Sequence, residues 1–287
     1  MNFRKTVLPP GLIFVGVPIG AARDITLRAL DVLASANVLV AEDTRSLRKL
    51  MEIHAIPLER RRILSLHDHS SPGIVAQLVD KVREGASVTY ASEAGMPLIA
   101  DPGFELARAM RDADLPVTAA PGPSAVLTAL AIGGLPTDAF HFVGFLPQTK
   151  GARQKALGAL SGIQATLIFY ESPKRLGAML ADAADALGAD RQAAVCRELT
   201  KKFEETRRGS LSDLAAAYEK PPKGEIVVLI DRARSQIVQQ SDVEEALSQA
   251  LQTMRTRDAA QHVAERFGLA RRDVYQTALR LSKDGTD

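Results

Sequence analysis

The chain has 287 residues, a formal net charge of +2, 46% hydrophobic residues and 24% charged residues. Its length exceeds that of a usual single domain, so we expect two domains or one long composite. A net charge this close to zero excludes a globally basic body, and any contact with nucleic acid must come from local patches. The single cysteine cannot form an internal disulfide, and no segment has the pattern of a signal peptide or a membrane span. We therefore expect a soluble, cytoplasmic protein that does not enter a membrane.

Strand-like and helix-like segments alternate through the first part of the chain. The short apolar runs predict strands at residues 11–16, 37–41, 61–66, 87–91 and 115–119. Amphipathic helices are predicted at 24–33, opened by Asp24 as the capping residue, from Ser71-Pro72 onward, and from Phe104 onward. This alternation favours a largely parallel sheet that helices cover on both faces.

The pattern is interrupted at Pro121-Gly-Pro-Ser124, which is the best candidate for a domain boundary. Beyond it, helices are predicted at 125–132, 150–160 and 174–187, and strands at 140–145, 165–170, 192–198, 204–209 and 225–231. No helix separates the strands at 192 and 204, which indicates a partly antiparallel second sheet. Residues 235–241 read as a polar linker. We therefore expect an α/β domain at 1–121, a second with a mixed sheet at 122–233, and a helical, arginine-rich extension at 234–287.

Well-known phosphate and metal motifs are absent from the sequence. No Gly-x-Gly-x-x-Gly follows the first strand, and there is no Gly-Lys-Ser/Thr loop, His-Glu-x-x-His or Cys-x-x-Cys. Loops rich in Gly and Pro instead follow the predicted strands, at residues 16–20, 95–97, 121–124 and 170–175. Because ligands of open α/β sheets lie beyond the carboxyl ends of the strands, these loops predict a cofactor site.

These loops resemble those of the tetrapyrrole methylase family, the class III S-adenosylmethionine-dependent methyltransferases. The resemblance runs from about Gly11 to Asp231, and it is closest to the family's ribosomal RNA branch. Short segments that carry it include 41–45 (Ala-Glu-Asp-Thr-Arg), 66–69 (Leu-His-Asp-His), 135–138, 144–147, 198–201 and 223–225. It implies two α/β domains with the cofactor between them, usually in a homodimer, and 2′-O-methylation of a cytidine in 16S rRNA of the small ribosomal subunit.

Carried over residue by residue, the family's S-adenosylmethionine contacts fall on loop residues of this chain. They are Pro18, Ala94, Gly95, Met96, Ile99, Ser124, Ala125, Glu171, Leu199, Gly224 and Glu225. Three positions depart from the ribosomal branch, which usually has Asn at Ala21, Asp at Glu93 and Thr at Met96. Met96 removes a hydroxyl from the presumed cofactor loop, and Glu93 extends a carboxylate by one methylene.

The same resemblance suggests which residues handle the RNA. We expect Asp43 to act as the general base that assists the 2′-hydroxyl, with His67 as the alternative. Arg45, Lys174 and Arg175 are expected to hold phosphates. The alternative without a catalytic role is that Asp43 or Thr44 caps a helix and that Arg45 is exposed to solvent. His67 and His69 make a weak metal pair, so no metal is predicted.

Residues 258–275 are typical of a helix, a glycine turn and a second helix. Apolar residues recur at Ala260, Val263, Ala264, Leu269, Val274 and Tyr275. Arg271 and Arg272, with three further arginines, favour nucleic acid, and a plain helical cap is the alternative. Two rival functions stay open from the sequence: C-methylation of a tetrapyrrole such as uroporphyrinogen, and RNA binding without catalysis.

Overall fold

The protein is seen in a computed structural model that describes residues 2–67, 72–233, 240–267 and 269–284. The chain forms two compact units, Met1–Arg232 and Ala233–Asp287. Asp68, His69 and Ser71, and most of the predicted linker at 235–241, lie outside the described residues.

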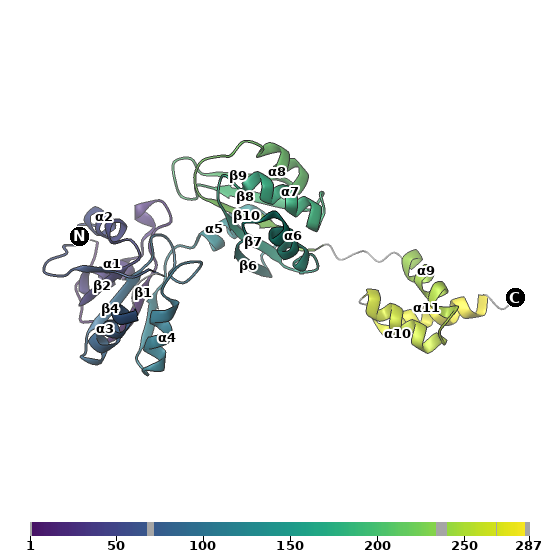
Figure 1. Ribbon diagram of the computed structural model, residues 1–287, viewed down its shortest axis with the longest axis horizontal. Helices are drawn as coiled ribbons and strands as arrows, with labels where there is room; N and C mark the ends of the chain where they lie inside the picture. Colours follow the sequence, from purple (N-terminus) through teal and green to yellow (C-terminus); the bar gives the residue numbers. More distant parts are fainter. Residues whose placement is uncertain (1, 68–71, 234–239, 268, 285–287) are drawn as a thin grey trace. The chain divides into compact units, whose positions relative to one another are not determined.

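The first sheet of the larger unit is parallel throughout (Figure 1). Its strands are β1 (Gly11–Val15), β2 (Val38–Ala41), β3 (Ile63–Ser65), β4 (Ser87–Ala91) and β5 (Val117–Ala120), in the order β3-β2-β4-β1-β5. Helices α1 (Leu27–Ser35) and α2 (Thr44–Ile53) pack on one face, and α3 (Pro72–Arg83) and α4 (Phe104–Asp112) on the other. Both faces are covered, which explains why the three central strands, β2, β4 and β1, are mostly apolar and buried at nearly every position.

The second sheet is mixed. Its strands are β6 (Phe140–Phe145), β7 (Thr166–Glu171), β8 (Gln192–Arg197), β9 (Glu205–Ser210) and β10 (Ile226–Ile230), in the order β6-β7-β10-β8-β9. Strand β10 runs antiparallel to both of its neighbours, and β8 runs antiparallel to β9. Helix α5 (Ala125–Gly133) covers one face, and α6 (Lys150–Ala159), α7 (Leu176–Leu187) and α8 (Leu211–Ala217) cover the other. The predicted α/β class and the partly antiparallel second sheet are confirmed.

Three helices near the strand ends differ from the sequence-based prediction: one starts later than predicted, and two were not predicted. Asp24 does not open the first helix: it ends a short 3-10 turn (Ala22–Asp24), and Thr26 caps α1 by accepting from the Ala29 N–H at 3.1 Å. Helix α2 was considered only through the capping alternative at Asp43 or Thr44, although four of its ten residues are apolar and Leu47 and Met51 are buried. Helix α8 was also missed; Ser210 caps it directly after β9.

The smaller unit contains three helices among its described residues, α9 (Gln240–Leu251), α10 (Thr256–Phe267) and α11 (Arg271–Asp284). Val263, Ala264 and Val274 are buried between them, as the apolar spacing predicts. Leu269 and Tyr275 differ from that pattern, since they are 38% and 36% exposed.

A close approach of two glycines joins the loops that follow β1 and β5. A Cβ added at Gly16 would lie 2.6 Å from Gly122 Cα, and one added at Gly122 would lie 2.8 Å from the Gly16 carbonyl carbon. No larger residue fits at either place without moving the backbone. Beside them, Val17 and Gly95 exchange two backbone hydrogen bonds of 2.9 and 3.1 Å, which attach the loop after β4. Three loops from neighbouring strands are thus held together.

We expect Gly122→Ala to lower the free energy of unfolding by about 1–3 kcal/mol, because the added methyl overpacks a backbone contact. Urea denaturation measures this change. Gly158→Ala is the control: Gly158 lies on α6, an added Cβ meets no atom within 4 Å, and the protein should gain about 0.5–1 kcal/mol. Equal effects of the two substitutions would contradict the proposed packing constraint.

Candidate active site

A cavity of about 410 Å³ opens where the strand ends of both sheets meet, within the larger unit. From the first sheet it is lined by loops after β1, β4 and β5; from the second, by residues at the ends of β6 and β7, after β8 and at the start of β10. The β10 start belongs there because Ile226 pairs with Glu171 and with Arg197, the last residues of β7 and β8. Its volume falls within the range of roughly 300–1,000 Å³ that small-molecule sites occupy.

The structure brings nearly all of the sequence-predicted cofactor residues to this one cavity. Those that line it are Ala94, Gly95, Met96, Ile99, Ser124, Ala125, Glu171, Leu199, Gly224 and Glu225. Pro18 is not among the lining residues, although the next residue, Ile19, is. Which of them contact a cofactor stays a prediction.

Backbone conformation explains why these loop positions carry glycine and serine. Gly95 has a φ of +73°, a left-handed conformation in which a side chain is disfavoured. Ser124 caps α5, and its hydroxyl accepts from the Leu127 N–H at 3.5 Å. Ser124 and Ala125 line the cavity, so the N-terminus of α5, where the first N–H groups have no partner within the helix, belongs to the cavity wall.

Glu171 places a buried carboxylate in the cavity wall. The residue is 3% exposed; its Oε1 accepts from the Ser172 N–H at 2.7 Å, and its Oε2 accepts no hydrogen bond while lying 3.3 Å from Arg175 Nη2. A buried carboxylate oxygen without a donor is costly. The cavity is thus suited to a ligand that carries hydrogen-bond donors or positive charge.

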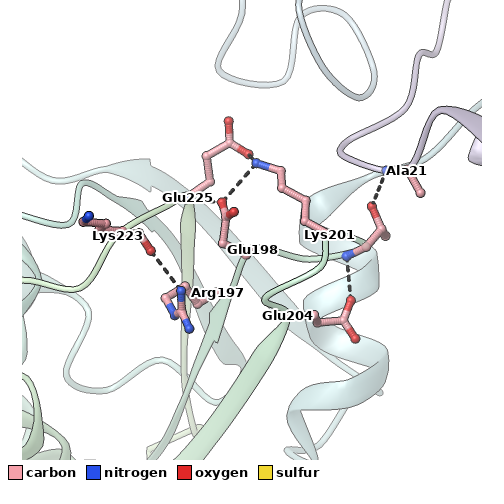
Figure 2. A network of polar contacts seen from close by, with 8 residues as sticks. Ala21, Arg197, Glu198, Lys201, Glu204, Lys223 and Glu225 are labelled. Atoms are coloured by element: carbon pink, nitrogen blue, oxygen red, sulfur yellow. Dashed lines mark hydrogen bonds and ion pairs between the residues drawn. The ribbon is translucent and has the colours of Figure 1, made fainter. Parts of the chain in front are cut away.

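A polar network connects the loop after β8 with the loop before β10 (Figure 2). Lys201 Nζ donates to Glu198 Oε1 at 3.1 Å and to Glu225 Oε2 at 2.8 Å. The Glu225 N–H donates to the same Glu198 oxygen at 3.1 Å, and this bond, with that of Lys201, lowers the pKa of Glu198. Burial opposes the charge on Lys201, but its bonds to Glu225 and Glu198 raise its pKa overall. The network fixes Glu225 next to the cavity.

The loop after β8 also contacts the loop after β1, which belongs to the first sheet. The Ala21 N–H donates to Thr200 Oγ1 at 3.0 Å, and the Thr200 N–H donates to Glu204 Oε2 at 2.5 Å (Figure 2). Ala21 is one of the positions that depart from the ribosomal branch, and only its backbone takes part. This departure therefore leaves the link between the layers intact.

Asp101 is a site residue that the sequence interpretation missed. It lines the cavity and also a second hollow of about 550 Å³ beside α4. Burial and the charge of Glu42 raise its pKa to about 6, with a smaller contribution from Glu93 and an opposing one from the Ser92 hydroxyl. Tyr170 lies nearby: burial and the charges of Asp101 and Glu225 raise its pKa to about 12. In the sequence Asp101 is only a carboxylate in a loop. Its burial depends on residues from other parts of the chain, so no sequence signal marked it as a site residue.

The predicted catalytic residues lie outside the first cavity. Asp43 caps α2, where its Oδ1 accepts from the Arg45 N–H at 2.7 Å, and this bond together with the Arg45 side chain lowers its pKa. Arg45 pairs with Asp43 at 3.4 Å, and its side chain is 92% exposed. His67 lines the second hollow. The capping alternative is thus what the structure contains at Asp43, and the catalytic roles of Asp43 and His67 stay predictions.

The predicted RNA-binding residues are spread over the chain. Lys174 is exposed just before α7, whereas the Arg175 guanidinium donates to the Leu146 and Pro147 carbonyls at 2.8 and 3.0 Å. The Arg175 guanidinium also lies 3.3 Å from the buried Glu171 carboxylate, so its positive charge is balanced within the fold. Arg271 and Arg272 are exposed in the smaller unit, at the start of α11.

Two negative findings concern only the described part of the chain. Within it, no group of three or more His, Cys, Asp or Glu side chains is arranged to hold a metal ion. None of its helices combines the length and apolar character needed to cross a membrane.

Comparison with known proteins defines the class. Residues 11–215 match the family described as tetrapyrrole (corrin/porphyrin) methylases, and residues 238–282 match the RsmI C-terminal HTH domain. Among solved structures, the fold is similar to uroporphyrin-III C-methyltransferase from Thermus thermophilus complexed with S-adenyl homocysteine. The TM-score is 0.53 at 18% identity, over 76% of this chain and 96% of that chain. The protein is a methyltransferase with the tetrapyrrole methylase fold.

Similar proteins of known name identify the group within this class. The chain is 42% identical to ribosomal RNA small subunit methyltransferase I of Mesorhizobium japonicum, covering 96% of this chain and 93% of that protein. It is 40% identical to the protein of the same name from Vibrio cholerae, over 97% and 98%. The chain belongs to the tetrapyrrole methylase family, and within it to the family of ribosomal RNA small subunit methyltransferases I.

Lys201→Met should lower the free energy of unfolding by about 1 kcal/mol at pH 7, since the lysine is partly exposed and its bonds are screened. The folded pKa of Glu198 lies below its ordinary 4.5, so its contribution is present above that pH and disappears as the pH falls. The folded pKa of Lys201 lies above its ordinary 10.5, so its contribution disappears as the pH rises past that value.

The difference between wild type and Lys201→Met should therefore be constant from about pH 6 to 9 and shrink below about pH 4.5. Urea denaturation across this range measures it. Lys220→Met, at an exposed lysine, should change stability by less than about 0.5 kcal/mol. A difference as large at pH 3.5 as at pH 7 would show that the ion pairs are not its source.

Proposed function

We propose that this enzyme transfers the methyl group of S-adenosylmethionine to the ribose 2′-hydroxyl of a cytidine in 16S rRNA of the small ribosomal subunit. The observation that carries the proposal is similarity along nearly the whole chain to proteins named ribosomal RNA small subunit methyltransferase I. The match of residues 238–282 to the C-terminal domain of that group supports it further. The substrate is thus proposed from the full-length likeness, since the fold alone is shared with tetrapyrrole enzymes.

The cavity between the two sheets fits S-adenosylmethionine. When bound, this cofactor supplies a methyl group on a positively charged sulfur. Glu171 offers a buried carboxylate whose Oε2 accepts no hydrogen bond and lies 3.3 Å from Arg175 Nη2, and this group suits the amino and hydroxyl donors of such a molecule. Ile19, Met96 and Leu199 supply apolar surface for the adenine. The role of the chain here is to bind, orient and exclude water.

Exposed basic residues are proposed to position the RNA backbone. Arg45 and Lys174 are available on the larger unit, and Arg271 and Arg272 on the smaller one. Arg175 is proposed to act indirectly, because its guanidinium is engaged with Leu146, Pro147 and Glu171. Phosphate contacts of this kind set orientation and register, not base identity.

An active homodimer and a cytoplasmic location are part of the proposal, since the family resemblance implies a homodimer and the relatives are named for the RNA of the small ribosomal subunit. Among the rivals, C-methylation of a tetrapyrrole would not explain the C-terminal match, and RNA binding without catalysis would leave the loop-lined cavity without a use. Incubating the purified protein with labelled S-adenosylmethionine and either small subunits or uroporphyrinogen tests the three directly. Label in the tetrapyrrole, or in neither substrate, would overturn the proposal.

Glu171→Gln should weaken S-adenosylmethionine binding about 10- to 100-fold, because a hydrogen bond to a charged group contributes about 1.5–3 kcal/mol. The substitution is isosteric, so the cavity keeps its shape. Calorimetric titration measures the affinity, and Glu219→Gln at an exposed site should leave it unchanged. Wild-type affinity in Glu171→Gln would remove Glu171 from the cofactor site.

Replacing Arg271 and Arg272 together by alanine should weaken binding to small subunits and make it less sensitive to salt. Each lost phosphate contact should lower the slope of log K against log[salt] by about 0.7 for single-stranded RNA. Affinity for the cofactor should not change. The paired control is Arg60→Ala with Arg62→Ala, two exposed arginines of the larger unit. An unchanged slope in the first variant would make the smaller unit a structural cap.

A further inference from the structure

Asp101 stands at the junction of two hollows. It is the only described residue that lines both the cofactor cavity and the second hollow beside α4. A methyl transfer needs the donor and the acceptor oxygen in contact, so the two ligands must meet at a shared wall. Asp101 is the carboxylate at that place.

The backbone that presents Asp101 is in an uncommon conformation. Leu98 and Ala100, which precede it, have φ values of +74° and +60°, and Gly103, which follows it, has +115°. Left-handed conformations at residues other than glycine are energetically costly and cluster at functional sites. The surrounding fold therefore holds this loop in a conformation that it would not adopt by itself.

The second hollow has the chemistry of a nucleotide site. Leu66, Val75 and Leu106 form apolar surface, and Phe104 is 63% exposed with the Arg108 guanidinium 5.9 Å from its ring centroid. Unstacked RNA bases bind to aromatic rings and to arginine planes of this kind. Glu105 and Asp112 add carboxylates at the same hollow, and a carboxylate is the acceptor that suits the amino group of cytosine.

We propose that the hollow beside α4 holds the target nucleotide, with its base against Phe104, and that Asp101 accepts the proton of its 2′-hydroxyl. This inference rests on the proposed function and deepens it. Asp101 is thereby an alternative to Asp43, whose carboxylate is engaged in capping α2.

The atoms of the step balance without any further reactant. The 2′-oxygen forms a bond to the methyl carbon with one of its lone pairs. The sulfur–methyl bond breaks, its electron pair stays on sulfur, and the positive charge there is lost. The hydroxyl proton passes to the Asp101 carboxylate and then to solvent, which regenerates the base.

The surroundings of Asp101 make it a stronger proton acceptor than an ordinary aspartate, with a pKa of about 6. The ionisable groups near it come from several elements: Glu42 after β2, Glu93 after β4, Tyr170 on β7, and His67, Glu105, Arg108 and Asp112 around the second hollow. Because a base must be deprotonated to work, methylation should fall as the pH drops through about 6.

Asp101→Asn should lower the single-turnover rate of methylation by about 10²-fold or more, the usual effect of a general base. Affinities for S-adenosylmethionine and for small subunits, measured by calorimetry and filter binding, should stay within about threefold of wild type. Asp43→Asn is made in parallel to compare the two carboxylates. A loss below tenfold in Asp101→Asn would overturn the inference, as would a larger loss in Asp43→Asn.

Glu42→Gln provides a test that keeps Asp101 in place. Removing this negative charge should lower the pKa of Asp101, so the acid limb of the pH–rate profile should move to lower pH. Glu84→Gln, at an exposed carboxylate outside both hollows, should leave the limb where it is. His67→Gln should keep the limb; if the limb is lost with His67 and survives in Asp101→Asn, His67 is the base and the inference fails.

A measurement independent of turnover is the ¹³C NMR titration of labelled aspartate carboxyls. The signal absent from Asp101→Asn identifies Asp101; it should titrate near pH 6 and move when a cytidine-containing oligonucleotide is added. Phe104→Ala should abolish that movement while the cofactor affinity is unchanged. If wild type fails to methylate small subunits, the proposed function falls; if it methylates them and Asp101 neither titrates near 6 nor responds to RNA, only this inference falls.

Discussion

The backbone contact between Gly16 and Gly122 is the constraint on which the site depends. It lets the loops after β1 and β5 touch, and the Val17–Gly95 bridge adds the loop after β4. These strands are neighbours in a parallel sheet, so their carboxyl ends lie along one edge. A methyl group at either glycine would push the loops apart. The cavity wall is therefore a consequence of main-chain packing more than of particular side chains.

The second sheet completes the cavity through the reversed direction of β10. Because β10 is antiparallel to β7 and β8, its first residues lie beside the last residues of both strands. Glu171 and Glu225 are thereby brought near each other from positions 54 residues apart in the sequence numbering. The Glu198–Lys201–Glu225 network then fixes the loop geometry, and the Thr200–Ala21 bond connects it with the first layer.

Electrostatics distinguishes three carboxylates that look alike in the sequence. Asp43 accepts from a helix N-terminus, which lowers its pKa and makes it a weak base. Glu171 is buried beside Arg175 and faces a ligand cavity. Asp101 is partly buried, and this burial together with the charges of Glu42 and Glu93 raises its pKa to about 6. The same side-chain chemistry thus serves capping, ligand binding and, as we propose, proton transfer.

By itself the sequence determined the alternation of strands and helices, the mixed second sheet and the family, because apolar runs and Gly/Pro loops are local signals. It also indicated the loops that line the cavity, since strand ends can be read from composition. Helices α2 and α8 were not predicted; α8 is only seven residues long and follows β9 directly. For Asp43 the sequence left a helix cap open as one alternative, and the structure contains that cap. Only the tertiary structure decided that Arg175 binds carbonyls of another loop and that Asp101 joins two hollows. Burial and charge proximity depend on residues distant in the chain, so no local pattern encodes them.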